Sequence, residues 1–441
     1  MEALHAFVAG HNVAIAAWLL IIAYIFIATE KIPKVTIALL GGVITVILGL
    51  VSQVKTLNGT INPEYFINFI DFNVIFLLVS MMIIVSITTR SGVFNYIANE
   101  FLKMTKGHPV KVLVVLGIFT AVVSAFLDNV TTVILIMPIT FSIAKKLDIN
   151  PVPFLLTEVF ASNIGGTSTL IGDPPNIIIG SAGGLSFMDF VRELTGVVAV
   201  ILVAAIIFLA FCFRKSLKAS ADKMEEVSKI DNSNTIVDKA LMIRSCIVLS
   251  LVILGFILHD MIHIETCIVA MLGASVLLLF EKPTQILSEV EWNTIFFFIG
   301  LFIIIGGLEA SGGIKLMAEW ILAVTKGSES ATAMIILWAS GIISGVIDNI
   351  PYTATMSPMI GEIQTLMGKD YAYPLWWCLS LGACLGGNMT IIGAAANVIV
   401  SENAAKSGHP ITFMQFLKYG IPVVFISLII STGYIYLRFL R

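Results

Sequence analysis

Two stretches of this chain carry the same pattern at a fixed spacing. Residues 124–132 read Ser-Ala-Phe-Leu-Asp-Asn-Val-Thr-Thr, and residues 344–353 read Ser-Gly-Val-Ile-Asp-Asn-Ile-Pro-Tyr-Thr. Their acidic residues, Asp128 and Asp348, lie 220 positions apart, and each is followed by an asparagine. An apolar run broken by Asp-Asn therefore occurs twice, which points to an internal duplication.

A second pair of motifs follows at nearly the same spacing. Residues 162–176 read Ser-Asn-Ile-Gly-Gly-Thr-Ser-Thr-Leu-Ile-Gly-Asp-Pro-Pro-Asn, and residues 384–397 read Cys-Leu-Gly-Gly-Asn-Met-Thr-Ile-Ile-Gly-Ala-Ala-Ala-Asn. The two Gly-Gly pairs are 221 positions apart. Earlier in the chain Leu40 matches Leu272 at an offset of 232, because the first half has a longer loop at 55–71. The duplication thus covers nearly the whole chain.

The composition is that of a membrane protein. Of 441 residues, 58% are hydrophobic and 12% charged, with a mean hydropathy of +1.00. A soluble domain carries roughly 25% charged residues. The net charge of −3 argues against a nucleic-acid partner. The five cysteines lie in apolar runs, which is typical of small core residues. The partner that this composition predicts is the lipid bilayer.

Eight uninterrupted apolar segments approach the length of about 20 residues that a bilayer crossing needs. Residues 13–29 are read as a retained helix and not as a signal peptide, because no small-residue cleavage signature follows. The predicted crossings are 13–29, 36–54, 72–89, 194–213, 241–258, 264–281, 292–309 and 417–437.

Each half follows one plan. Three crossings precede a short amphipathic segment (93–106 or 314–326), a helical hairpin with Asp-Asn at its tip, a crossing broken around Gly-Gly, and a last crossing. Five crossings is an odd number, so the second half must lie inverted in the membrane. We therefore predict an all-α polytopic membrane protein of two inverted-topology repeats, each with five transmembrane helices, one re-entrant hairpin and a broken helix.

Charge gives the domain boundaries and the orientation. The repeats are predicted at 1–213 and 241–441, and the hydrophilic segment 214–240 joins them. Eleven basic residues fall on one side of this arrangement, which the positive-inside rule makes cytoplasmic. They are Arg90, Lys103, Lys106, Lys111, Lys145, Lys146, Arg214, Lys215, Lys218, Lys223 and Lys229. The segment 214–240 is accordingly a solvated cytoplasmic linker, and both termini lie outside. We expect a multi-pass protein of the cell (inner) membrane.

The Asp-Asn tips have the chemistry of a cation site. An ionised aspartate at membrane depth is costly unless a partner or water stabilises it. Carboxylate, amide and hydroxyl oxygens suit Na⁺, and a carboxylate also carries a proton. The alternative is a turn-capping aspartate, but two Asp-Asn pairs at equivalent places favour an ion site. The predicted Na⁺ ligands are Asp128, Asn129, Asp348 and Asn349, with Thr131 and Thr353 beside them.

The Gly-Gly segments are predicted to complete the site. Adjacent glycines let a helix unwind and let its backbone approach an ion, and half-helix ends offer partial charges. The alternative is a glycine contact between packed helices; the surrounding polar residues favour the site. Pro174 and Pro175 must end or kink a helix. The candidate ligands are Asn163, Gly165, Gly166, Thr167, Asp173, Asn176, Gly386, Gly387, Asn388, Thr390 and Asn397.

The remaining polar residues narrow the substrate class. Neither tip and neither Gly-Gly segment contains lysine or arginine, so a cation, a proton or a neutral solute is favoured over a multiply charged anion. Glu158 is either a third titratable group or a residue near the membrane interface. The motifs HExxH and GxSxG are absent from the sequence, which argues against an enzyme. No cofactor is expected besides Na⁺, H⁺ or both as coupling ions.

These four motifs resemble the ArsB/NhaD permease superfamily and, within it, relatives of the melanosomal P protein. The resemblance covers roughly residues 15–437. It implies a scaffold, a transport domain, an elevator-type movement and a homodimer. It leaves the substrate open among Na⁺/H⁺ exchange, arsenite, and carboxylate or chloride transport. It places the ion site at Asp128, Asn129, Asn163, Asp348, Asn349 and Asn388.

Three functions remain, in order of preference. The first is ion-coupled secondary active transport, as Na⁺/H⁺ antiport. The second is an anion, carboxylate or arsenite transporter of the same fold, driven by H⁺ or Na⁺. The third is a passive channel.

Overall fold

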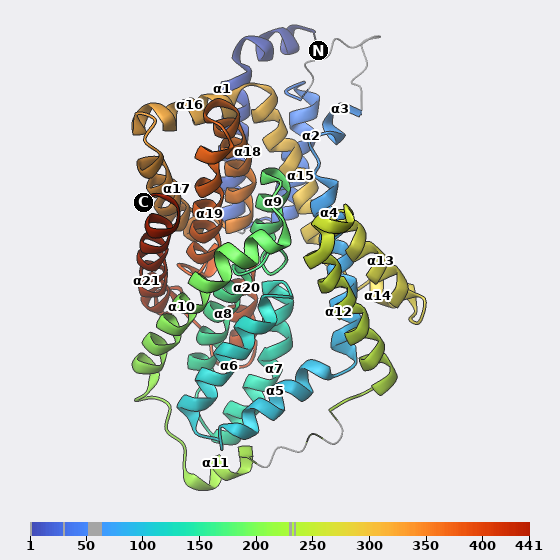
Figure 1. Ribbon diagram of the computed structural model, residues 1–441, viewed down its shortest axis with the longest axis vertical. Helices are drawn as coiled ribbons and strands as arrows, with labels where there is room; N and C mark the ends of the chain where they lie inside the picture. The colour runs from blue at the N-terminus through green and yellow to red at the C-terminus, as the bar shows by residue number, and fades with distance from the viewer. Residues whose placement is uncertain (1, 30, 52–63, 229–231, 233–234) are drawn as a thin grey trace.

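The chain is a long array of α-helices, seen in a computed structural model that describes residues 2–29, 31–51, 64–228, 232 and 235–441 (Figure 1). These residues contain no β-strand. Eight of the helices formed by them are long and apolar enough to cross a membrane. The prediction of an all-α polytopic membrane protein is therefore confirmed.

The helices of the first half follow the predicted order. After α3 (Glu64–Ile67) come a crossing, an amphipathic helix, two hairpin arms, two pieces of a broken helix and a last crossing. The bounds are α1 (Glu2–Thr29), α2 (Lys34–Ile47), α4 (Phe72–Arg90), α5 (Val93–Met104), α6 (Pro109–Ser124), α7 (Asn129–Leu147), α8 (Val152–Gly166), α9 (Pro174–Gly183) and α10 (Phe187–Phe213).

The second half repeats this order helix by helix. A short helix, α14 (Pro283–Leu287), takes the place of α3, and the linker carries α11 (Ala221–Ser228). The other bounds are α12 (Lys239–Ile262), α13 (Thr266–Leu278), α15 (Trp292–Ala310), α16 (Gly313–Thr325), α17 (Glu329–Ile347), α18 (Asn349–Met367), α19 (Lys369–Gly386), the 3₁₀ turn η1 (Ile391–Gly393), α20 (Ala395–Lys406) and α21 (Phe413–Phe439).

The two amphipathic helices α5 and α16 lie at opposite ends of the molecule's long axis (Figure 1). Both begin after a glycine with positive φ, Gly92 at 84° and Gly312 at 86°, where the chain turns sharply out of the preceding crossing. Inverted halves require this placement at opposite ends. The inversion across a membrane, the re-entrant course of the hairpins and the domain boundaries stay predictions.

Two predicted crossings are wrong in length. The segments 36–54 and 264–281 form the helices α2 and α13, of 14 and 13 residues. At 1.5 Å per residue each measures about 20 Å, less than the roughly 30 Å hydrocarbon core. Residues 52–54 lie outside the described residues. The two long helices that replace them in the set of eight are the hairpin arms α7 and α17.

The short helices are held by the opposite half. α2 packs on α15, and α13 packs in the same way on α4. Close backbone approach makes this possible: a Cβ on Gly300 of α15 would lie 2.4 Å from the carbonyl carbon of Ala38 in α2. The broken helices are exchanged too, because α9 packs on α18 while α20 packs on α7. The four central segments therefore form one unit built from both halves.

Most described residues of the linker are exposed, but two parts of it dock on the protein. The side chain of Asn232 is buried; it donates to Glu100 Oε1 at 2.7 Å and accepts from Asn99 Nδ2 at 2.9 Å. Helix α11 packs on α5 and α7. At Gly107 (φ 70°), a Cβ would lie 2.1 Å from the Met224 carbonyl oxygen. The sequence pattern missed this because polar side chains make the contacts.

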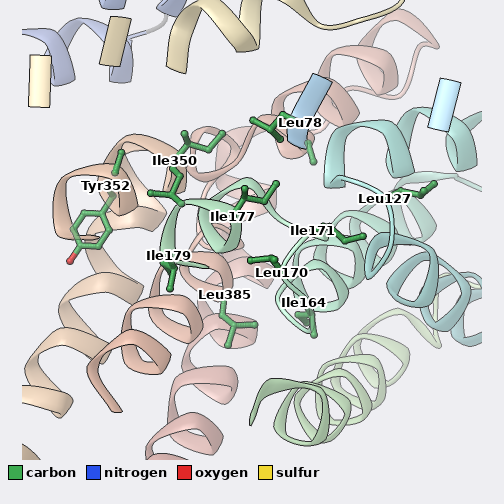
Figure 2. Close-up of a cluster of buried hydrophobic side chains, with 14 of the residues drawn as sticks. Leu78, Leu127, Ile164, Leu170, Ile171, Ile177, Ile179, Ile350, Tyr352 and Leu385 are labelled. Atoms are coloured by element: carbon green, nitrogen blue, oxygen red, sulfur yellow. The ribbon is translucent and has the colours of Figure 1, made fainter. Parts of the chain in front are cut away.

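Apolar side chains from both halves surround the central segments. Figure 2 shows residues of the first tip, of both broken helices and of the second tip lying together, all of them buried. Every residue of α8 is buried, so this broken helix lies inside the protein. The labelled members are Leu78, Leu127, Ile164, Leu170, Ile171, Ile177, Ile179, Ile350, Tyr352 and Leu385.

Candidate functional site

The first hairpin turns at Asp128, which caps helix α7. Its carboxylate accepts from the Thr131 backbone N–H at 2.9 Å and from the Thr131 hydroxyl at 2.5 Å. Asn129 turns inward, and its Oδ1 accepts from Ser124 Oγ at 2.7 Å. Asp128 and Thr131 are half-buried and Asn129 is buried. The aspartate therefore caps the helix, as the alternative interpretation predicted, and its half-buried carboxylate still makes the tip polar.

The second hairpin turns at Asp348 in a different conformation. Asp348 has φ 105°, a region that side chains rarely adopt, and it caps α18 through the Ile350 N–H at 3.1 Å. Its side chain also bonds Lys34 Nζ at 3.1 Å, and only 7% of the Asp348 side chain is exposed. The expectation of a site without a basic residue is therefore wrong. Lys34 reaches the tip from 314 positions away.

The broken helices unwind after their glycines. Gly165 and Gly166 still belong to α8, and Gly386 ends α19, so the non-helical segments are 167–173 and 387–394. A Cβ at Gly165 would lie 2.1 Å from the Ala121 carbonyl oxygen, and one at Gly386 would lie 2.4 Å from that of Gly341. These two glycines pack closely against the hairpin arms, as the alternative interpretation holds. The α-helices end at or directly after them, and an approach of their backbone to an ion stays a prediction.

One asparagine in each half holds the unwound backbone. Asn176 Nδ2 donates to the Thr169 carbonyl at 2.9 Å and to the Thr167 carbonyl at 3.1 Å. Asn397 Nδ2 donates to the Thr390 carbonyl and to the Gly387 carbonyl, both at 2.8 Å. Buried carbonyls need donors of this kind.

A threonine ties each unwound segment to its own hairpin tip. The Thr169 hydroxyl donates to the Ala125 carbonyl, and the Thr390 hydroxyl donates to the Gly345 carbonyl at 2.6 Å. Thr390 is 221 positions after Thr169, and Gly345 is 220 after Ala125. The duplicated sequence therefore builds the same contact twice.

Asparagines also cross between the halves. Asn163 Nδ2 of α8 donates to Asn388 Oδ1 at 2.8 Å and to Asn397 Oδ1 at 3.0 Å. At the equivalent position of α19, Cys384 Sγ donates to Asn176 Oδ1 at 3.4 Å. These side chains are fully or almost fully buried. The predicted residues Asn163, Asn176, Asn388 and Asn397 are thus brought together into one network.

Asp173 connects this network to the second tip. It is 1% exposed, and both of its oxygens accept from Asn349 Nδ2, at 3.4 and 3.5 Å. The Asn129 amide and the Cys384 thiol lie beside it. Both Asp-Asn tips therefore meet at a carboxylate supplied by the first broken helix. Its counterpart in the second half is Ala394.

A cavity of about 430 Å³ adjoins both tips. Val130, next to the first Asp-Asn, lines it together with Asp348 and Lys34. Glu291, at the start of α15, also lines it and lies within electrostatic range of Asp128 and Lys34. The cavity therefore reaches the second tip at Asp348 and the first tip at Val130.

Three further residues singled out from the sequence, Thr167, Thr353 and Glu158, are buried. Thr167 is fully buried, and its hydroxyl donates to the Asn163 carbonyl at 2.8 Å. Thr353 is fully buried, and within the described residues its hydroxyl has no hydrogen-bond partner. Glu158 is 1% exposed and accepts from the Thr140 hydroxyl, so its carboxyl group lies inside the protein, and its role as a titratable group or a residue near the membrane interface stays a prediction.

Three residues at the site were not found from the sequence. Lys34 begins the short helix α2 and Glu291 directly precedes α15, where charged residues are ordinary. Tyr24 of α1 donates to the Pro351 carbonyl at 2.5 Å. The signal that existed for Lys34 is its position in the first turn of a helix, where a positive charge is unfavourable. Within the described residues no group of three or more His, Cys, Asp or Glu side chains could hold a metal ion.

Two helical hairpins and two broken helices around a buried polar centre define a membrane transporter. A citrate transporter family profile matches residues 24–382. The chain belongs to this family, which confirms the resemblance seen in the motifs.

Relatives support the same class. The chain is 41% identical to an uncharacterized transporter of Mycobacterium bovis over 96% of this chain and 98% of that protein. It is 40% identical to the 46 kDa membrane protein of Mycobacterium leprae over 97% and 99%. It is 30% identical to the P protein of Sus scrofa over 96% of this chain and 59% of that longer protein.

A solved structure shares the fold. The YdaH transporter of Alcanivorax borkumensis, whose crystal structure is described as having an unusual topology, matches with a TM-score of 0.60 over 97% of this chain and 98% of that one. The identity is 10%, so the likeness concerns the fold alone. The chain is a transporter and not an enzyme, and a multi-pass integral membrane protein. Its bacterial relatives accord with the cell (inner) membrane.

Proposed function

We propose that this transporter is an ion-coupled secondary active transporter, and that it exchanges Na⁺ for H⁺ at the paired Asp-Asn tips. The observation that carries the proposal is the meeting of Asn349 with Asp173 beside Asn129, which joins both tips and the first broken helix. Asp173 lies within electrostatic range of Asp348, and Asp128 begins the first tip directly before Asn129. Oxygen ligands of this kind suit a hard cation.

The mechanism is competition between Na⁺ and protons for the same carboxylates. Na⁺ binding and protonation each neutralise a carboxylate, so the site carries one or the other but not both. Asn129 and Asn349 supply amide oxygens in place of water. An alternating-access movement then exposes the loaded site to either side of the membrane.

An elevator-type movement fits the packing. The hairpins and broken helices form one exchanged unit, while the crossings α4 and α15 are covered by the short helices α13 and α2. We propose that the first group moves as a body against the second, and that the protein works as a homodimer.

The test is Na⁺-dependent proton flux in proteoliposomes that contain purified protein. Asp128→Asn and Asp348→Asn keep the side-chain shape and remove the charge, and each is expected to abolish the flux. Undiminished flux in both variants would overturn the proposal. A matched control is Asp148→Asn in the cytoplasmic mouth of the first hairpin, where the residue ends α7 away from the tips.

A second candidate is carboxylate transport driven by H⁺ or Na⁺. The match to a citrate transporter family and the ammonium of Lys34 on the cavity favour it over other anions. Uptake of radiolabelled citrate, arsenite and chloride under imposed Na⁺ and H⁺ gradients separates it from Na⁺/H⁺ exchange. Flux that ignores an opposing gradient of the coupling ion would identify a channel instead.

A further inference from the structure

The ion pair between Lys34 and Asp348 makes the two hairpin tips electrically unequal. The distance from Lys34 Nζ to Asp348 Oδ2 is 3.1 Å, and the lysine side chain is 35% exposed toward the cavity. The first tip shows no such pair: the described contacts of the Asp128 carboxylate are those to Thr131. A fixed positive charge therefore lies on one tip and not on the other.

The lysine occupies a position that a helix does not favour. Lys34 is the first residue of α2, directly after Pro33, where the unpaired N–H groups already concentrate positive charge. The Phe297 ring lies 5.3 Å from Nζ and supports the ammonium from the side. Lys34 is unfavourable for the helix dipole, but its ammonium lies near both a carboxylate and an aromatic ring. We infer that this lysine serves the site and does not stabilise the helix.

The second half has an uncharged residue at the position equivalent to Lys34. At the offset of 232 that aligns Leu40 with Leu272, Lys34 aligns with Thr266. Thr266 lines a separate cavity of about 290 Å³ with Asn73, the counterpart of Asn293 in the first cavity. Equivalent positions of the two halves therefore place a lysine on one cavity and a threonine on the other.

We propose that Lys34 is the resident cation of the second tip, and that it limits the number of Na⁺ ions the site binds. This inference rests on the proposed function. The ammonium occupies the side of Asp348 that faces the cavity, where Na⁺ would approach. Two cations on one carboxylate repel each other, so Na⁺ binds at Asp128 and Asp173 while Asp348 is neutralised by the protein itself.

Lys34 thereby determines the specificity and the stoichiometry of coupling. Without its charge, Asp348, Asn349 and the cavity would form a second Na⁺ site. Without Asp348, the ammonium would remain in the cavity unpaired and would repel Na⁺ from the first site. The loss of flux expected for Asp348→Asn then arises from the released lysine as well as from the lost carboxylate.

The experiment measures how many Na⁺ ions purified full-length protein binds, by ²²Na⁺ scintillation proximity. Lys34→Met is expected to bind one Na⁺ more per chain than the wild type, with a steeper dependence on Na⁺ concentration. Lys34→Arg keeps the charge and is expected to bind as the wild type does. The double variant Lys34→Met/Asp348→Asn removes both charges and is expected to recover wild-type stoichiometry, whereas Asp348→Asn alone binds at least tenfold more weakly.

Each result decides the matter. A Lys34→Met protein that remains monodisperse and binds the wild-type number of ions overturns this inference alone. If Lys34→Met does not fold, a double variant no better than Asp348→Asn overturns it, because the rescue is predicted to come from removing the free ammonium. A wild-type protein that binds no Na⁺ overturns the proposed function, and this inference with it.

Discussion

The two hairpin tips share a sequence and differ in backbone, partner and neighbour. Asp128 has an ordinary φ of −62° and is half-buried, whereas Asp348 has φ 105°, is 5% exposed and carries Lys34. The first broken helix brings Asp173 to the centre, and the second brings Ala394. Duplication thus preserved the frame, namely the threonine ties and the asparagine supports. The charges diverged, because the first half supplies both Asp173 to the centre and Lys34 to the tip of the second half.

The largest effect is expected where the halves differ most. Asp173→Asn keeps the shape of the side chain and removes its charge, which makes the first unwound segment as neutral as the second. Na⁺-dependent proton flux in proteoliposomes should fall at least about tenfold, equivalent to about 1.4 kcal/mol of lost stabilisation of the transported state. Ala394→Ser, at the matching position, is the control and should keep the flux of the wild type. Unchanged flux in Asp173→Asn would show that this carboxylate is not used.

Equivalent glycine substitutions in the two halves should lower the stability of the protein by similar amounts. Gly165→Ala would place a Cβ 2.1 Å from a carbonyl oxygen of a hairpin arm, and Gly386→Ala would place one 2.4 Å from the equivalent oxygen. Overpacking of this kind costs about 1–3 kcal/mol, so both variants should lower the melting temperature in detergent. A large drop in only one of them would contradict the equivalence of the two joints.

The matched control is Gly433→Ala. Gly433 lies inside α21, and among the described residues no atom of a neighbouring helix or side chain would come within 4 Å of its added Cβ. Alanine therefore meets open space there. Alanine is favoured over glycine inside a helix by about 1 kcal/mol, and this variant should melt at or above the wild-type temperature.

The hydrogen bonds that Asn163 makes to the other half should stabilise the protein more than the equivalent bond of Cys384. Asn163→Ala leaves the amide oxygens of Asn388 and Asn397 without their donor, at a cost of about 1–3 kcal/mol. Cys384→Ala removes a weak thiol donor, and Asn176 Oδ1 keeps its bond from Ser380 at 2.7 Å, so its cost should stay below about 1 kcal/mol. Thermal unfolding of both variants tests the order, and equal losses would contradict it.

The smallest effect is expected at the joint of the two last helices. Arg438 of α21 pairs with Glu193 of α10 at 3.0 Å, but its side chain is 56% exposed. Arg438→Gln should therefore cost less than about 1 kcal/mol, and Tyr434 still donates to the Glu193 carbonyl at 2.6 Å. A loss in melting temperature as large as that of Gly165→Ala would show that this ion pair joins the halves more firmly than its exposure indicates.

The parts of the site that could be predicted are those that the sequence repeats. The Asp-Asn tips recur at an offset of 220, and the breaks and the asparagines Asn176 and Asn397 recur at 221, so each copy supported the prediction for the other. Lys34 could not be found in this way, because its counterpart is Thr266 and its partner is 314 positions distant. The packing partner of Gly165 could not be found for a related reason: a pattern shows that a glycine is present, but only the structure shows that the Ala121 carbonyl lies against it.

The lengths of α2 and α13 were also beyond the pattern. Hydropathy continues past the ends of both helices, so an apolar run of about 20 residues was read as a crossing. The helices end early, and the opposite half covers them. Hydropathy is high both for a helix that faces lipid and for a helix that is buried in protein. The sequence alone therefore could not separate these two surroundings for α2 and α13.

The exchange of α9 and α20 between the halves has a consequence for how the chain can be divided. Neither half closes its own centre, because the second piece of each broken helix finds its packing partner in the other hairpin. A chain cut within the linker should yield two fragments that are each degraded when produced alone and that recover transport when produced together. The ancestor of such a duplicated protein would then have required two copies to fold, which makes assembly older than the fusion that now enforces it.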